Sequence, residues 1–247
     1  LILSKIFRYE CRRLMWNRFF FGILLILLFF GYQVLNRITI LGAARTAPFS
    51  PWSLGDYACR MLPLLWAAAL FFLNFFLSPA ARRAAALTAF TPVSLRRYET
   101  IRLGAALTAV GVLTVLCLGE AALFCAGYFH QNPGWDLLRP ALITLVPALV
   151  FALGSGWQLG QICPSAIFAW MAVPILFRLL PLPAPFSLWS GQFFSEYPLT
   201  LETLDPSLTL PGPVLLLQML LLAAGILLLS LSYIRDRLNS SALTGGL

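Results

Sequence analysis

The sequence predicts an all-α polytopic membrane protein of six transmembrane helices, with an N-terminal amphipathic helix and both termini in the cytoplasm. Of its 247 residues, 60% are hydrophobic and only 11% are charged. A single soluble domain of this length cannot bury so much apolar surface. Apolar runs of about 17 to 25 residues, the length that crosses a bilayer, also recur along the chain. The predicted spans are residues 19–36, 61–77, 103–129, 140–159, 165–180 and 213–234.

The distribution of basic residues predicts the orientation of these spans. The chain has 17 Lys and Arg against 9 Asp and Glu, a net charge of +8. Basic residues are enriched in cytoplasmic loops, so the face that carries most of them is assigned to the cytoplasm. That face holds the N-terminal segment, the connection between spans two and three, and the C-terminal tail, residues 235–247. Its basic residues are Lys5, Arg8, Arg12, Arg13, Arg18, Arg82, Arg83, Arg96, Arg97, Arg102, Arg235 and Arg237.

Residues 1–18 precede the first span and have two faces at helical spacing. The apolar side chains of this segment fall on one side of a helical wheel and the basic ones on the other. This pattern predicts a helix lying in the cytoplasmic headgroup layer. Basic residues that only flank the first span are the equally weighted alternative. The apolar side consists of Leu3, Phe7, Cys11 and Leu14, and the basic side of Lys5, Arg8 and Arg12.

Tryptophans and prolines mark the spans further. Because an indole buries its ring and keeps its N–H hydrated, tryptophans near predicted boundaries are interpreted as interfacial anchors. Those residues are Trp16, Trp52, Trp135, Trp157 and Trp189. Pro147 and Pro174 lie inside spans four and five, where a missing N–H predicts kinks.

The connection of residues 78–102 between spans two and three contains helix signals of its own. Ser78 can cap a helix that has Pro79 in its first turn, and Thr91-Pro92 ends that helix. Ser94 can then cap a second helix that leads directly into span three. A capped, charged element projecting from two spans suits a cytoplasmic partner that drives the bundle. A solvated basic loop is the alternative.

Residues 86–97 read ALTAFTPVSLRR, an apolar run followed by Pro, a small hydrophobe, Ser and basic residues. With the amphipathic segment, the six spans and the long outer segment, this motif resembles an ABC-2-type permease, the membrane subunit of an ATP-binding-cassette exporter. The resemblance implies that the connection docks onto a separate ATPase subunit, which holds the ATP and Mg²⁺, and that two permease chains pair around the export route. The coupling residues it implies are Arg82, Arg83, Leu87, Phe90, Pro92, Arg96, Arg97, Tyr98 and Glu99.

The residue inventory is consistent with ATP hydrolysis in another subunit. Lys5 is the only lysine, so the phosphate-binding motif G-x-x-x-x-G-K-[ST] does not occur. The five cysteines are scattered without a C-x-x-C pair, so neither a disulfide framework nor a zinc site is predicted. The excess of cations is explained by membrane orientation and lipid contact, and no nucleic-acid partner is expected.

Span three combines small residues with a carboxylate. Small side chains fall on one stripe of its helical wheel and let another helix approach closely. A charged carboxylate inside a membrane costs roughly 2.5–3.5 kcal/mol or more, so Glu120 should be protonated, paired or facing a polar cavity. Glu120 and Arg178 are candidates for the translocation route or a subunit contact, with a structural hydrogen bond as the alternative for Glu120. The helix-packing candidates are Gly104, Thr108, Gly111 and Gly119 of span three and the G-x-x-x-G pair Gly156 and Gly160 of span four.

The outer segment of residues 182–212 carries three acidic residues and no Lys or Arg. Phe186, Trp189 and Phe193 follow helical spacing, which predicts a short helix on or in the outer leaflet. The family resemblance implies re-entrant helices here.

Other functional classes fit less well. An intramembrane serine enzyme needs a base, yet the only histidine, His130, and Ser155 lie at opposite ends of their spans. A secondary transporter that uses Glu120 as its proton site remains the principal alternative, although inverted repeats are not evident. A membrane scaffold without transport activity is a further alternative. The sequence therefore predicts a non-enzymatic permease subunit of an ATP-driven exporter in a bacterial plasma membrane.

Overall fold

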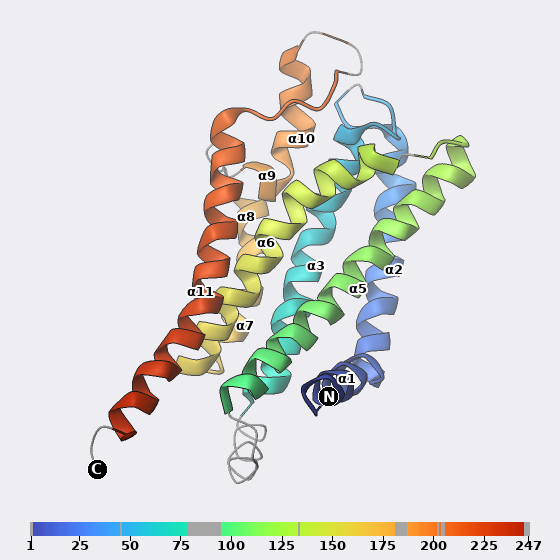
Figure 1. Ribbon diagram of the computed structural model, residues 1–247. Coiled ribbons are helices and arrows are strands. Elements are labelled where there is room, and N and C mark those ends of the chain that lie inside the picture. The colour runs from blue at the N-terminus through green and yellow to red at the C-terminus, as the bar shows by residue number, and fades with distance from the viewer. Residues whose placement is uncertain are drawn as a thin grey trace.

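The computed structural model describes residues 2–44, 46–78, 95–132, 134–180, 187–201, 203 and 206–244. No strand occurs among these residues, and their regular structure is helical (Figure 1). Within the described part of the chain, five helices are long and apolar enough to cross a membrane. These five apolar helices indicate a membrane-embedded protein. They are α2 (Arg18–Arg37), α3 (Pro51–Leu77), α5 (Leu95–Phe129), α6 (Gly134–Ile162) and α11 (Gly212–Thr244).

Shorter helices complete the chain. The amphipathic helix α1 (Ile2–Met15) lies across the end of the bundle at which α2 begins (Figure 1). α11 runs from the opposite end of the bundle toward the end at which α1 lies (Figure 1). The remaining elements are η1 (Thr39–Leu41), α7 (Ala166–Met171), α8 (Val173–Leu179), α9 (Ser187–Ser190), α10 (Gln192–Glu196) and η3 (Tyr197–Leu201).

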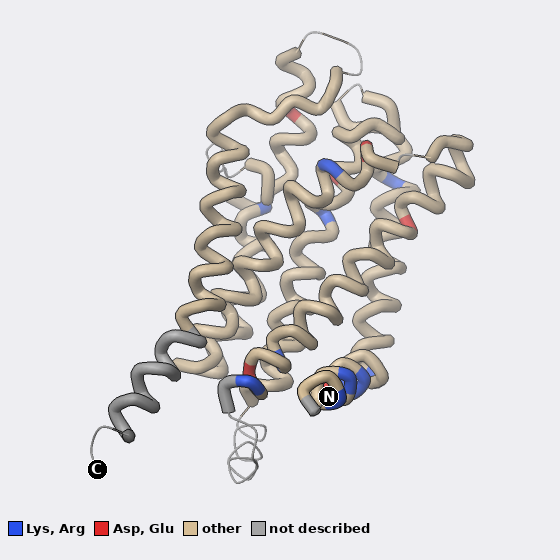
Figure 2. The backbone as a smooth tube through the Cα atoms, in the orientation of Figure 1, with Lys and Arg blue, Asp and Glu red and all other residues tan. Residues whose placement is uncertain are grey.

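Helix α3 is the core of the bundle. Most of its side chains are buried, Trp66 and Leu70 among them. It contacts α2, α5 and α6, while α6 in turn packs against α11. Along the middle of the long helices few charged residues are found, and Lys and Arg gather on α1 (Figure 2).

Glycines set the closest helix contacts. A Cβ at Gly156 would overlap Leu70, and one at Gly160 would overlap Leu77 and Ile167. Gly154 and Gly225 bring the backbones of α6 and α11 together, since a Cβ on either would meet backbone atoms of the other helix. Small residues therefore fix the α3–α6–α11 layer.

The predicted fifth span, residues 165–180, is not one helix. It is divided into α7 and α8 at Ala172, and α8 has Pro174 in its first turn. Pro174 has no N–H to donate to the preceding turn, so the predicted kink becomes a break. α7 to α10 follow one another along the bundle, and together they lead the chain from the α1 end to the opposite end (Figure 1).

Helix ends also differ from the predicted spans. α3 begins at Pro51 rather than residue 61, because the Ser50 hydroxyl accepts a hydrogen bond from the Ser53 N–H at 3.3 Å and caps the helix. α5 begins at Leu95 and continues without interruption into the predicted third span. α11 extends through most of the predicted tail to Thr244.

Two of the five proposed tryptophan anchors are exposed. Trp16 is 77% exposed and Trp135 is 63% exposed. The interpretation was wrong for Trp52, Trp157 and Trp189, which are buried. The reason is tertiary: α9 and α10 fold onto α3, where Trp52 contacts Phe193 and donates to the Pro206 carbonyl at 2.7 Å.

Candidate functional site

The described part of the coupling region lies at the start of α5. Residues 79–94 are outside the described residues, and with them Arg82, Arg83, Leu87, Phe90 and Pro92; the Arg96 side chain is outside them as well. Arg97 is exposed, and Tyr98 and Glu99 are half-buried. The site can therefore be built from α5 and from the helix beside it.

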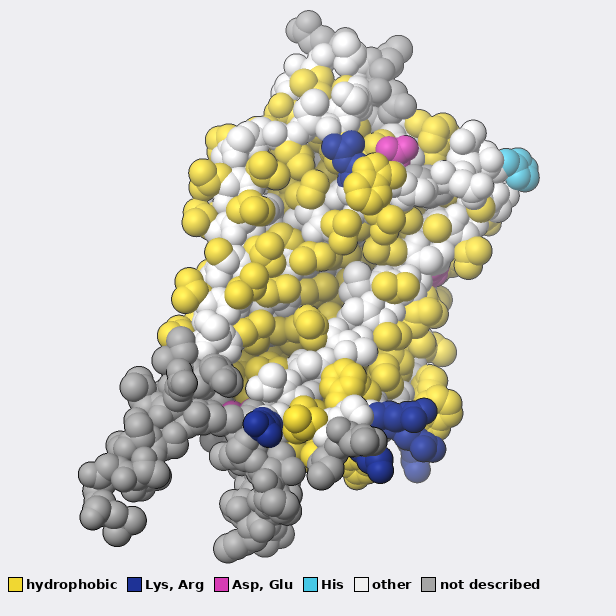
Figure 3. Space-filling view, viewed as in Figure 1, with side chains coloured by type: hydrophobic (Ala, Val, Ile, Leu, Met, Phe, Trp, Pro, Cys, Tyr) yellow, Lys and Arg dark blue, Asp and Glu magenta, His cyan; other side chains and the backbone are white. Residues whose placement is uncertain are grey.

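That neighbouring helix is α1. Its apolar face, with Cys11 and Leu14 buried, packs on the bundle, and its basic face stays exposed (Figure 3). The contacts of α1 are chiefly with α5. Burial raises the pKa of the Cys11 thiol, in agreement with the apolar contact on this face.

One acidic residue of α1, Glu10, is buried between the two helices with only 1% of its surface exposed. The Tyr98 hydroxyl donates to Glu10 Oε1 at 2.7 Å, and Arg102 Nη2 donates to the same hydroxyl at 3.1 Å. Arg102 Nε lies 4.0 Å from Glu10 Oε1, and Arg13 Nη1 lies 3.6 Å from Glu10 Oε2. We name Glu10, Tyr98 and Arg102 the α1–α5 lock.

The α1–α5 lock balances its charge locally. The Glu10 carboxylate faces two guanidinium groups, and the Arg102 guanidinium also covers the Phe76 ring of α3 at 5.6 Å. A buried carboxylate is stable only where such partners replace water. The lock therefore couples α1, α5 and the end of α3 into one unit, at the end of α5 that follows residues 79–94.

Sequence reasoning assigned Tyr98 to the coupling residues, placed Arg102 at the end of the connection of residues 78–102 and among the orientation charges, and missed Glu10. A signal was present, because Glu10 is the single acidic residue among the basic residues of α1. The contact between the two residues could not be inferred from the sequence, since 88 positions separate Glu10 from Tyr98.

Glu120 lies where α2, α3 and α5 meet. A Cβ added at Gly31 would overlap its carboxylate and crowd the Tyr57 hydroxyl. That hydroxyl donates to the Cys117 carbonyl at 3.0 Å. Glu120 Oε2 is buried and has no hydrogen-bond partner among the described residues. Glu120 thus faces its own bundle, in the half of α5 far from α1.

Arg178 is half-buried on α8 and lies within electrostatic range of Asp56 and Arg60 of α3. Arg60 Nε pairs with Asp56 Oδ2 at 2.7 Å, and Asp56 is buried. The group contains two cations and one anion. Asp56 and Tyr57 are neighbours in α3, so Arg178 and Glu120 belong to separate polar groups beside the same turn of that helix.

The stripe of small residues on α5 is largely left uncovered by the residues that the structure describes. Gly104 is approached by Phe7 of α1, and Thr108 donates to the Gly104 carbonyl at 2.8 Å. No atom lies within 4 Å of a Cβ built at Gly111 or Gly119. The helix expected to pack there is not found among the described residues, because α5 turns its other face to α2 and α3.

Among the described residues, no group of three or more His, Cys, Asp or Glu side chains could hold a metal ion. Ser155 donates to the Phe151 carbonyl and accepts from the Trp170 indole at 2.9 Å, so its hydroxyl serves helix packing. No family model, no curated protein and no solved structure matches the chain.

Proposed function

We propose that this chain is the permease subunit of an ATP-driven exporter in a bacterial plasma membrane. A separate ATPase would act on its α1 end, and a second permease chain would complete the translocation route. The single observation that carries the proposal is the α1–α5 lock. It joins the interfacial helix to the helix that directly follows the connection in which the ABC-2 resemblance is found.

The mechanism follows from the length of α5. At 1.5 Å per residue its 35 residues extend over about 52 Å, from the α1 end to the opposite end. A force on residues 79–94 would act on α5 and, through buried polar contacts, on α1 as well. Rigid-body movement of these two helices against α6 and α11 would then alternate access to the route.

A purified complex provides the test. We expect a co-purifying ATPase whose hydrolysis is stimulated by the permease, and Tyr98→Phe to reduce that stimulation several-fold because the lock loses its central hydroxyl. Tyr9→Phe is the matched control, since Tyr9 is an exposed tyrosine on α1. Unchanged stimulation in a folded Tyr98→Phe complex would remove the lock from the mechanism.

A secondary transporter that uses Glu120 as its proton site is the second candidate. The observation in its favour is the buried Glu120 oxygen without a partner among the described residues. Proteoliposomes that contain the chain alone distinguish the two proposals. Flux that follows a proton gradient without ATP, and that is lost in Glu120→Gln, would favour this candidate over the exporter.

A further inference from the structure

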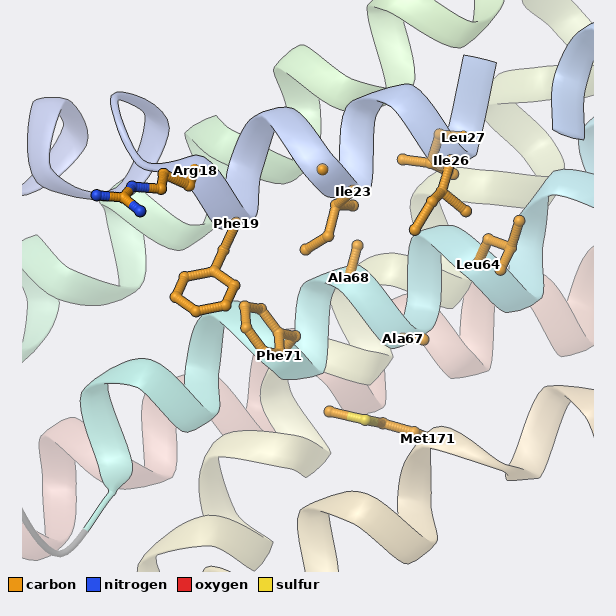
Figure 4. A pocket seen from close by; sticks show the side chains of 11 residues that line it. Arg18, Phe19, Ile23, Ile26, Leu27, Leu64, Ala67, Ala68, Phe71 and Met171 are labelled. Carbon is orange, nitrogen blue, oxygen red and sulfur yellow. The ribbon is translucent and has the colours of Figure 1, made fainter. Parts of the chain in front are cut away.

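An apolar groove runs along α2 on the side where α3 and α7 approach it. Its volume is about 410 Å³, within the range of small-molecule sites, and Phe19 and Ile23 of α2 face Leu64 and Phe71 of α3 across it (Figure 4). Met171 of α7 closes a third side. The small residues Gly22, Ala67 and Ala68 also line it. Among the described residues, no acidic side chain lines the groove.

Of the described residues that line the groove, the one charged residue, Arg18, lies at one end. Arg18 begins α2, and in Figure 4 its guanidinium extends beyond Phe19, away from the apolar part of the groove. In the part of the chain that the structure describes, no carboxylate pairs with Arg18. The exposed indole of Trp16 lies two residues away, a position typical of the membrane interface. The groove therefore has a cationic end at headgroup level and an apolar body.

We propose that this groove binds an acyl chain of an anionic phospholipid, whose phosphate pairs with Arg18. The apolar walls offer no directional hydrogen bond, so they select a flexible hydrocarbon rather than a polar ligand. From Arg18 to Leu27 the groove follows α2 for about 14 Å, at 1.5 Å per residue. The unpaired cation then selects a negatively charged headgroup at the membrane surface.

A helix of a second copy is the rival occupant. A helix with its side chains is about 10 Å in diameter, wider than a single hydrocarbon chain. It could insert only side chains, whereas a single hydrocarbon chain can lie inside the groove. The basic face of α1 beside the groove also repels an identical basic face and attracts anionic lipid.

The test uses the full-length purified chain in detergent, with bound lipids counted by native mass spectrometry. Phosphatidylglycerol and phosphatidylcholine with identical acyl chains are titrated separately. Wild type should retain phosphatidylglycerol more tightly than phosphatidylcholine. Gly22→Leu places a side chain in open space at a position that lines the groove and should weaken both lipids about tenfold, the loss of burial of roughly two methylene groups.

Two further variants separate the tail site from the headgroup site. Arg18→Gln should weaken phosphatidylglycerol more than phosphatidylcholine, whose choline cation already offsets its phosphate, and should so remove the preference for phosphatidylglycerol. Gly127→Leu is the matched control, because Gly127 is also a helical glycine with open space but lies on α5, and its lipid binding should equal that of wild type. Equal melting temperatures of the four proteins establish that each is folded.

Three outcomes would overturn the proposal. Lipid retention in Gly22→Leu equal to that of the control would place the lipid elsewhere, and an unchanged preference in Arg18→Gln would remove the headgroup contact. A wild-type dimer that becomes monomeric in Gly22→Leu without any change in lipid count would assign the groove to a second copy. None of these results depends on transport or on an ATPase, so the exporter proposal is tested separately.

Discussion

At the residue scale, Glu120 is accommodated because Gly31 on the facing helix has no side chain. The carboxylate occupies the space that a Cβ at Gly31 would take, next to the Tyr57 hydroxyl. Any larger residue at position 31 must displace one of these two polar groups in a buried junction. Close packing at such a point transmits small volume changes to the surrounding helices.

We expect Gly31→Ala to destabilise the protein by about 1 to 3 kcal/mol, the usual cost of overpacking a well-filled site. The measurement is thermal unfolding in detergent, and Gly22→Ala is the control on the same helix, because a Cβ there meets nothing within 4 Å. The penalty should shrink when Gly31→Ala is combined with Glu120→Ala. Additive effects of the two substitutions would contradict the contact between these positions.

Cys163, which lies between α6 and α7, is the one exposed cysteine of the five. A hydrogen bond from the Ser165 hydroxyl, supported by the Ala166 N–H, lowers the pKa of its thiol below the ordinary value. Because a lower pKa raises the thiolate fraction near neutral pH, alkylation there should be faster than for an ordinary thiol. Ser165→Ala should slow alkylation at pH 7, and the difference should disappear well above both pKa values. A pH profile of maleimide labelling that is the same in both proteins would rule out this hydrogen bond.

At the element scale, α1 is more than an amphipathic helix resting on the bundle. Its buried Glu10 contacts two residues on successive turns of α5. Burying a carboxylate in an otherwise basic helix is unfavourable unless partners compensate for lost hydration. The interaction therefore fixes the position of α1 along α5. Apolar contacts alone would allow α1 to slide along the bundle.

Removing one hydrogen-bond partner of Glu10 should show how much the docking of α1 depends on this buried contact. Tyr98→Phe leaves Glu10 without its closest donor and should cost about 1 to 3 kcal/mol in the free energy of unfolding. In a Glu10→Gln background the same substitution should cost less, because the buried charge is then absent. Tyr9→Phe on the exposed face of α1 is the control and should have little effect. Equal costs of Tyr98→Phe in both backgrounds would argue against the α1–α5 lock.

At the scale of the whole molecule, the long helices run between two ends of the bundle that carry different residues. The cysteine at the α6–α7 turn and the basic helix α1 lie at one end, and exposed Trp135 lies near the start of α6 at the other. Because basic residues are enriched on the cytoplasmic side of membrane proteins, the prediction stays that the first end faces the cytoplasm.

A membrane-impermeant maleimide tests this orientation. In right-side-out vesicles Cys163 should react only after the membrane is opened, whereas Trp135→Cys in a Cys163→Ser background should react at once. Inside-out vesicles should give the reverse order. Labelling of both cysteines from the same side would contradict the arrangement of α6 across the membrane.

Much of the fold was predictable because hydropathy is a local property. The apolar runs located α2, α5, α6 and α11 to within a few residues at most ends, and the two-faced pattern located α1. Hydropathy and residue spacing did not predict the helices from α7 to α10 correctly. There Pro174 divides one apolar run into two helices, and Gly191, with a φ of 83°, separates α9 from α10.

The sequence by itself determined that the protein is helical and membrane-embedded and that a carboxylate lies in span three, because composition and spacing suffice for these. Only the tertiary structure decided that Glu10 meets Tyr98, that Gly31 makes room for Glu120, and that Trp52 and Trp189 are buried. The tertiary structure also decided that small residues of α5 face outward and that a groove lies beside Gly22. The physical reason is that these features depend on which faces of distant helices meet, and the spacing within one helix carries no information about its partner.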